Sequence, residues 1–159
     1  MTDDLRIVPA NEASWEDLQT VFGTRGTAPI CQCQRFKLRR LESFGSFPAE
    51  ERARRLRKET NSGNPQARTT SGLIAYLDGE PVGWCAVEPR TAYRRLTSTA
   101  WRGRSEDKQD DSVWAVTCFI TRVGYRKRGV TYALARDAGE PARTRGARAS
   151  AGSRRTSPA

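Results

Sequence analysis

Residues 113–138, VWAVTCFITRVGYRKRGVTYALARDA, decide the fold of this chain. The segment opens with an unbroken apolar run over residues 113–120, rich in β-branched and aromatic residues, which is typical of a strand buried on both faces. It turns basic at residues 126–128, reaches Gly129, and resumes with apolar residues at helical spacing. This pattern predicts a strand, a loop and a helix, and the unpaired N–H groups of the helix's first turn favour an anion. The same residues also fit a βα unit whose basic loop binds nothing.

Two further strands are predicted at residues 72–77 and 80–87. Asp78 and Gly79 join them, and this dipeptide favours a type I′ hairpin turn, in which both central residues take positive φ. Pro81 is expected near the strand start, where no backbone donor is needed.

The basic loop resembles a motif of a known enzyme family. RKRGVT, residues 126–131, is similar to the Gln/Arg-x-x-Gly-x-Gly/Ala pyrophosphate loop of the GCN5-related N-acetyltransferases (GNAT), with Thr131 where Gly or Ala is usual. GLIAYLDGEPVGWCAV, residues 72–87, resembles the second and third strands of the same family. The resemblance implies acetyl-CoA as co-substrate, bound by these residues: Phe119, Ile120, Thr121, Arg126, Lys127, Arg128, Gly129, Val130 and Thr131.

The resemblance also implies a fold and a reaction. The expected fold class is α/β (α+β), a mixed, mostly antiparallel twisted sheet flanked by helices. The expected activity is transfer of an acetyl group from acetyl-CoA to a primary amine by direct attack on the thioester. A bulge in the fourth strand would free a backbone amide near Phe119 or Ile120 to polarise the carbonyl. Glu88 is the first candidate for the base, and Asp110 or Asp111 come second.

The N-terminal part is predicted to hold a strand and two helices. Residues 5–8 form the strand, and residues 11–22 form a helix in which Ser14 and Asp17 have capping-box spacing. A second helix over residues 48–60 follows a proline and carries acids first and bases last. Residues 30–47 lack periodicity, and the family places its acceptor site under this region. The residues there that either line such a pocket or pack the segment onto the sheet are Cys31, Phe36, Phe44 and Phe47.

Loops are expected elsewhere, at residues 23–29, 61–71 and 88–112. The last of these is long and charged, without apolar periodicity.

Composition narrows the function classes. The chain has 159 residues, a length typical of one domain, and a net charge of +10 that favours anionic partners. No apolar run has membrane-spanning length and the N-terminus lacks a hydrophobic signal segment, so a soluble, cytoplasmic protein is expected. The chain contains no histidine, which excludes Ser-His-Asp and Cys-His triads.

The four cysteines show no disulfide pattern. Cys85 and Cys118 fall in predicted strands and are expected in the core. Cys31 and Cys33 have the spacing of half a metal site, but no second pair completes it, so no metal is predicted.

The C-terminal part departs from the family. Residues 139–159 contain no Val, Ile, Leu, Met, Phe, Tyr or Trp, and Pro141 is expected to end the helix. The prediction is a GNAT-like domain over residues 1–138 and a basic disordered tail over residues 139–159. The family's fifth strand, fourth helix and the tyrosine that protonates the thiolate would be missing, as in a truncated or frame-shifted tail, and activity would be impaired.

Two alternatives remain open at this point. The tail has five arginines against Glu140, and a basic tail on a basic domain is also typical of non-specific nucleic-acid binding. The second alternative is a protein of the same fold that binds the coenzyme but does not catalyse the reaction. The acceptor amine, a small molecule or a peptide, and the oligomeric state are not indicated by any residue.

Overall fold

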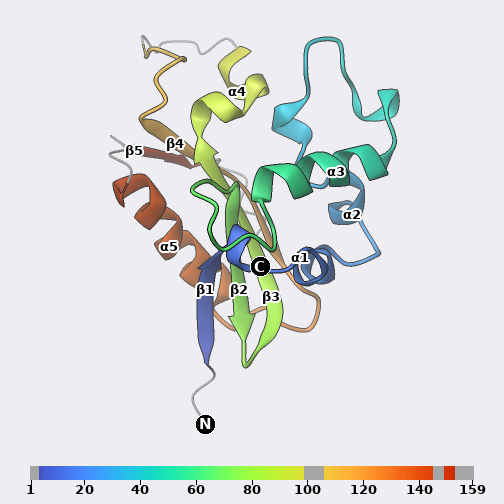
Figure 1. The fold of residues 1–159 in the computed structure, drawn as a ribbon, viewed down its shortest axis with the longest axis vertical. Helices are drawn as coiled ribbons and strands as arrows, with labels where there is room; N and C mark the ends of the chain where they lie inside the picture. The colour runs from blue at the N-terminus through green and yellow to red at the C-terminus, as the bar shows by residue number, and fades with distance from the viewer. Residues whose placement is uncertain (1–3, 99–105, 145–148, 153–159) are drawn as a thin grey trace.

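A single sheet organises the molecule (Figure 1). The computed structural model describes residues 4–98, 106–144 and 149–152. Within them the strand order is β1-β2-β3-β4-β5. β1 to β4 are antiparallel neighbours, and β5 runs parallel to β4. The strands are β1 (Leu5–Pro9), β2 (Gly72–Leu77), β3 (Glu80–Pro89), β4 (Val113–Thr121) and β5 (Ala149–Gly152). The predicted mixed, mostly antiparallel sheet is therefore confirmed.

Helices cover both faces of this sheet. α5 lies against one face, and α1, α2 and α3 lie on the other side (Figure 1). The α-helices are α1 (Trp15–Phe22), α2 (Ala28–Cys31), α3 (Ala49–Thr60), α4 (Arg94–Ser98) and α5 (Val130–Thr144). Short 3-10 helices are η1 (Ala10–Glu12), η2 (Arg35–Lys37), η3 (Phe44–Ser46) and η4 (Arg90–Ala92). No helix in the described ranges is long and apolar enough to cross a membrane.

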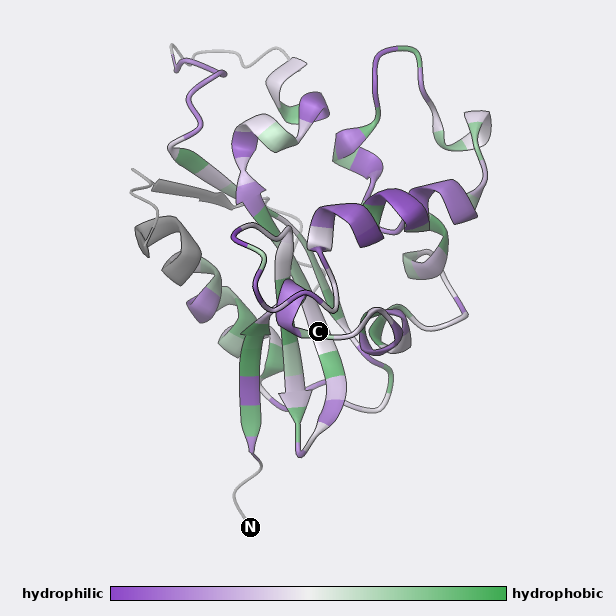
Figure 2. Cartoon of the chain, viewed as in Figure 1, coloured by the Kyte–Doolittle hydropathy of each residue, from purple (hydrophilic) through white to green (hydrophobic). Residues whose placement is uncertain are grey.

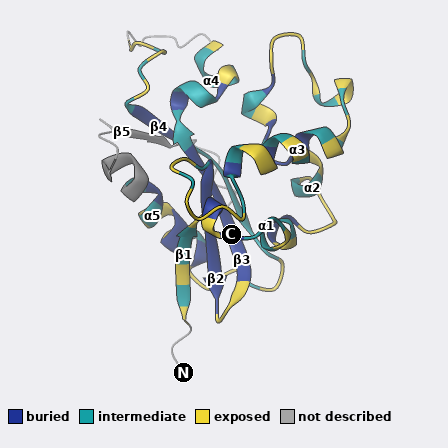
Figure 3. Cartoon of the chain, viewed as in Figure 1, coloured by how far each residue is buried: buried dark blue, intermediate teal, exposed yellow. Residues whose placement is uncertain are grey.

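The sheet separates two hydrophobic cores, and β2 and β3 are buried along most of their length (Figure 3). On one side Val130 and Leu134 of α5 pack on alternate residues of the central strands, such as Val87. On the other side α1 and α3 cover Trp84, which is fully buried. This arrangement follows from the period-two alternation of side chains along each strand.

Local chemistry explains several element boundaries, as the sequence predicted. The Asp17 backbone N–H donates to Ser14 Oγ at 3.0 Å and caps α1. Pro48 precedes the first residue of α3. Asp78 and Gly79 have φ of 50° and 83°, as a type I′ turn requires.

The sheet contains two irregularities. Tyr76 pairs with Pro81 while Ala75 pairs with Gly83, so Val82 is an extra residue in β3. Pro81 therefore lies beside a bulge, where its missing N–H disturbs the ladder least. The second irregularity lies in β4 and shapes the candidate site.

Two expectations about the C-terminal part are wrong. α5 continues through Pro141 to Thr144, because proline's φ is compatible with a helix and the helix loses one backbone hydrogen bond there. Residues 149–152 form a fifth strand, since backbone pairing with the edge of β4 does not require apolar side chains. The rest of the predicted tail, residues 145–148 and 153–159, lies outside the described residues.

The predicted loop over residues 88–112 is also partly ordered into regular elements. β3 extends to Pro89, and η4 and α4 follow. Arg90 is buried and holds this region by donating to Glu106 at 3.0 Å and to the Asp107 carbonyl at 2.7 Å. An arginine buried in this way has no periodic signature in the sequence.

Candidate active site

The described residues pair differently with the two edges of β4. Its first part, Val113 to Val116, pairs with β5 on the outer side. Beyond Thr117, no described residue pairs with the outer edge of β4, while the inner edge stays paired with β3. Thr117 itself is the extra residue of a bulge, because Val87 pairs with Val116 and Ala86 pairs with Cys118. The outer edge of residues 117–121 is called the open edge below.

The bulge lies earlier than the sequence predicted. Phe119 and Ile120, which were expected to flank it, pair regularly with Cys85 and Trp84. Its effect is visible in the packing: Val116 and Phe119, three residues apart, both contact the core under α5. An unbroken apolar run hides such a shift, because every position in it suits burial on either face.

The open edge leads directly to the start of α5. Lys127 and Gly129 have φ of 62° and 79°, and this left-handed turn brings the chain from β4 into the helix. Ala133 N–H donates to the Gly129 carbonyl at 3.1 Å, so the preceding N–H groups of the first turn are those that a helix leaves unpaired. A Cβ placed on Gly129 would meet no atom within 4 Å, so the space beside the turn is open.

Six of the predicted coenzyme residues fall into three groups. Arg126, Lys127 and Arg128 are exposed around the turn. Thr131 Oγ1 lies 3.2 Å from Thr121 Oγ1, so these two hydroxyls link the helix start to the end of β4. Val130 is 2% exposed and belongs to the core. It lies one helical turn before Leu134, so both side chains face the sheet.

A cluster of buried charges lies on the opposite face of the sheet from α5. Lys37 Nζ donates to Glu88 Oε1 at 2.8 Å and to Glu59 Oε2 at 2.9 Å. The lysine side chain is 10% exposed, and its ammonium lies 5.3 Å from the centre of the Tyr93 ring. Side chains of η2, α3, β3 and the residue after η4 therefore meet here. Lys37, Glu59 and Glu88 are called the charge cluster below.

Two carboxylates share one ammonium in the charge cluster, and this sets their protonation. Burial raises the pKa of Glu88, and Lys37 opposes this shift without cancelling it. Burial lowers the pKa of Lys37, but Glu88 and Glu59 outweigh burial and raise it overall. Lys37 is thus held as an ammonium, and Glu88 is a carboxylate that takes up a proton more readily than an ordinary glutamate.

Tyr93 connects the charge cluster to the bulge. It is 1% exposed, and its hydroxyl has no hydrogen-bond partner among the described residues. Burial raises the pKa of Tyr93, and the nearby Glu88 charge raises it further, whereas Thr117 lowers it. Glu88 and Thr117, distant in sequence, therefore both act on this ring.

Cysteine thiols flank the same region. The indole Nε1–H of Trp84 donates to Cys33 Sγ at 3.1 Å, and Cys33 packs with Cys118 against the core under α1 and α3. Cys85 is buried, as expected of a core residue. In the described part of the chain, no three Cys, Asp or Glu side chains are grouped to bind a metal.

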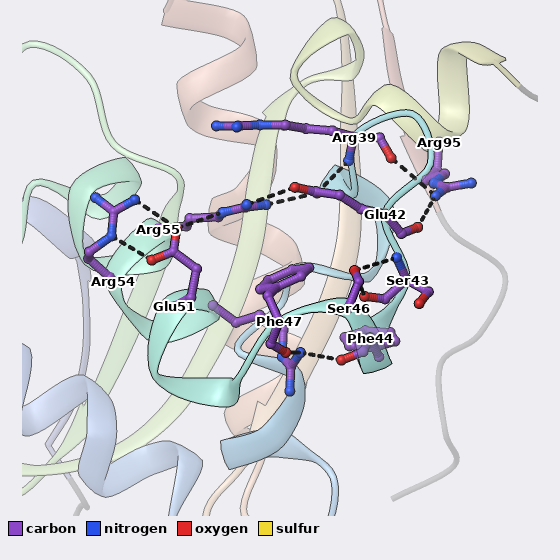
Figure 4. Close-up of polar contacts among 11 residues, drawn as sticks. Arg39, Glu42, Ser43, Phe44, Ser46, Phe47, Glu51, Arg54, Arg55 and Arg95 are labelled. Atoms are coloured by element: carbon purple, nitrogen blue, oxygen red, sulfur yellow. Dashed lines mark hydrogen bonds and ion pairs between the residues drawn. The ribbon is translucent and has the colours of Figure 1, made fainter.

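The segment over residues 39–47 is fixed to α3 by arginines (Figure 4). Arg55 donates to both oxygens of Glu42 at 2.8 and 2.9 Å, and Arg52 donates to the carbonyls of Phe44 and Phe47. Both guanidinium groups also stack on the Phe47 ring. Phe44 and Phe47 therefore pack this segment against α3, not onto the sheet as one of the two alternatives predicted.

The second candidates for the base have a local structural role. Asp110 accepts from the Ser112 backbone N–H at 3.0 Å and from its hydroxyl at 2.6 Å, in the turn before β4. Asp111 is exposed in the same turn.

Sequence reasoning missed four residues of this site: Lys37, Glu59, Tyr93 and Thr117. Lys37 lies in a segment without periodicity, and 51 positions separate it from Glu88. Glu59 is one of several charges on α3, a helix that is hydrophilic along most of its length (Figure 2). No pattern in one sequence distinguishes these residues from solvent-exposed ones.

Known structures share this fold. Aminoglycoside N-acetyltransferase AAC(6')-Iy in complex with CoA aligns with a TM-score of 0.53 and 14% identity, over 98% of this chain and 78% of that one. The same enzyme with the bisubstrate analogue CoA-S-monomethyl-acetylneamine aligns with a TM-score of 0.54 and 14% identity, over 99% and 82% of the two chains. No family model and no curated protein matches the sequence. The chain therefore has the fold of the GCN5-related N-acetyltransferases.

Proposed function

We propose that this protein is an N-acetyltransferase that transfers an acetyl group from acetyl-CoA to a primary amine of a small molecule or peptide. The observation that carries the proposal is the continuity between the open edge of β4 and the left-handed turn at Gly129. An extended ligand arm with amide groups can pair with an unpaired strand edge, and a pyrophosphate suits the start of a helix. Acetyl-CoA carries both groups in one molecule.

The positive charge of the loop before α5 also supports acetyl-CoA as the ligand. Arg126 and Lys127 are exposed beside the turn, and neither side chain has an ion-pair partner within the described ranges. Arg128 and Arg122 both stack on Tyr125, at 5.5 and 5.4 Å from the ring centre, which orders this basic loop. The loop therefore offers positive charge where the phosphates would lie.

Glu88 is proposed as the base. It lies at the end of β3, opposite Ala115 of β4 and close in the ladder to the bulge at Thr117. Its raised pKa suits a group that must accept a proton from an ammonium near neutral pH. The backbone at Thr117, where the ladder is broken, replaces Phe119 and Ile120 as the candidate for polarising the thioester carbonyl.

Calorimetry with acetyl-CoA tests the coenzyme site on two matched variants. Gly129→Val and Gly63→Val introduce the same strain, because the two glycines have φ of 79° and 80° and neither Cβ would meet an atom within 4 Å. We expect micromolar binding by the wild type and by Gly63→Val, and none by Gly129→Val. Equal binding by all three proteins contradicts the site.

Turnover separates the three function classes. Free thiol should be released from acetyl-CoA when a panel of small amines and peptides is added. Binding without release on any amine indicates a silent coenzyme-binding module. Nucleic-acid binding that weakens steeply with salt, without coenzyme binding, indicates the basic binding protein instead.

A further inference from the structure

Lys37 places a primary amine against the proposed base of the reaction. Its Nζ donates to Glu88 Oε1 at 2.8 Å within the charge cluster. We infer that Lys37 is itself an acceptor, and that the protein acetylates this side chain in cis when acetyl-CoA is bound. The inference rests on the proposed function, because it uses the same coenzyme edge and the same base.

The position of the amine follows from the strand register. Glu88 pairs with Ala115, and the open edge begins two residues further along β4, at Thr117. The centre of the Tyr93 ring lies 5.3 Å from Lys37 Nζ, and Thr117 of the bulge lowers the pKa of Tyr93. The amine thus lies on the face of the sheet opposite α5, beside the strand positions that precede the bulge.

The charge cluster already has the hydrogen bond that the reaction needs. The Lys37 ammonium passes one proton to Glu88 across the 2.8 Å contact. The free amine attacks the thioester carbonyl carbon, the C–N bond forms, the C–S bond breaks, and the thiolate leaves and takes up a proton. The products are an N-acetyl side chain, coenzyme A and one released proton, so atoms and charge balance.

Acetylation would change the charge cluster as well as the lysine. An acetamide is neutral, so Glu59 and Glu88 would lose the cation that both now contact at less than 3 Å. Two partly buried carboxylates without a cation repel each other and are destabilising. The modified protein should therefore unfold at a lower temperature than the unmodified one.

Burial distinguishes this reaction from ordinary chemical acetylation. Lys58 and Lys127 are exposed, whereas the Lys37 side chain is 10% exposed and is held as an ammonium. A small reagent such as acetic anhydride should therefore modify Lys58 and Lys127 before Lys37. Acetyl-CoA bound to the protein should give the reverse order.

The test is peptide mass mapping after incubation of the full chain with acetyl-CoA and no added amine. We expect one acetyl group on Lys37, formed with a rate constant independent of protein concentration. Lys37→Arg keeps a cation and should show no such product. Glu88→Gln should slow the modification at least tenfold, while calorimetry shows that it still binds acetyl-CoA.

A mixture tests whether the reaction is in cis. Gly129→Val, which should not bind the coenzyme, is mixed with wild-type protein and acetyl-CoA, and should stay unmodified at Lys37. Acetylation of Lys37 in that variant, or faster modification of Lys58 than of Lys37 in the wild type, overturns the inference.

The same samples separate this inference from the proposed function. If acetyl-CoA binds and an added amine is acetylated while Lys37 stays unmodified, self-acetylation is wrong and the enzyme assignment stands. If acetyl-CoA does not bind, both are wrong.

Discussion

Gly83 of β3 lies directly beneath Val130, the first residue of α5. A Cβ placed on Gly83 would be 2.5 Å from Val130 Cγ1, closer than packed atoms approach, and 3.1 Å from Leu134 Cδ1, which is a tight contact. The absence of a side chain at this strand position thus allows α5 to pack closely on the sheet.

Gly83→Ala should therefore displace the start of α5. We expect a loss of about 1–3 kcal/mol in the free energy of unfolding, typical of overpacking, and weaker acetyl-CoA binding. Adding Val130→Ala to this variant removes the Cγ1 atom that is too close and should restore part of both losses. Urea unfolding and calorimetry on the two single variants and the double variant measure the coupling; strictly additive effects would show that the two residues do not interact.

The pH dependence of turnover should report the charge cluster. Glu88 must be ionised to accept a proton, so activity should rise with pH through its pKa, which burial raises above the ordinary value of about 4.3. The groups facing it are Lys37 from η2, Glu59 from α3 and Tyr93 after η4.

Glu59→Gln removes a negative charge that raises the pKa of Glu88, so the acid limb of the kcat/KM profile should move to lower pH. Glu50→Gln, at an exposed position of the same helix, should leave the limb in place. An acid limb that is identical in Glu59→Gln and wild type would rule out Glu88 as the titrating base.

Acid should weaken the contact between Glu42 and α3. The hydrogen bonds from Arg55, and then from the Arg39 backbone N–H, lower the pKa of Glu42 to about 2. A lowered folded-state pKa stabilises the protein above the unfolded-state value of about 4.3, and this contribution is lost as the pH falls toward about 2. The stability difference between wild type and Glu42→Gln, measured by urea unfolding, should thus shrink as the pH is lowered over that range.

Leu56 should dominate the attachment of α3. It is 1% exposed and packs in the core with Trp84, whereas most of the helix is charged. Leu56→Ala should cost about 2–5 kcal/mol, and Lys58→Ala, two residues away on the exposed side, less than about 0.5 kcal/mol. Similar costs for the two variants in urea unfolding would show that α3 is held by its ion pairs instead.

The parts of the fold that the sequence predicted are those whose cause is local. The Asp78–Gly79 turn, the Ser14 cap and the apolar run of β4 each depend on a few adjacent residues. Their energetics are visible in the order of residue types alone.

The parts that it did not predict depend on contacts between distant segments. Lys37 is a buried ammonium only because Glu59 and Glu88 come from two other elements. The bulge at Thr117 lies within a run whose residues would suit either register, so its position is set by pairing with β3. The final strand forms because β4 offers it a partner edge, although its own composition disfavours burial.

The open edge also has a consequence for the protein in solution. An unpaired stretch of strand is a template for edge-to-edge association with another chain. A coenzyme seated along residues 117–121 would occupy these backbone groups as an additional strand does. Acetyl-CoA would then prevent self-association of the protein as well as supply its acetyl group. Light scattering of the protein without coenzyme should show self-association, and added acetyl-CoA should reverse it.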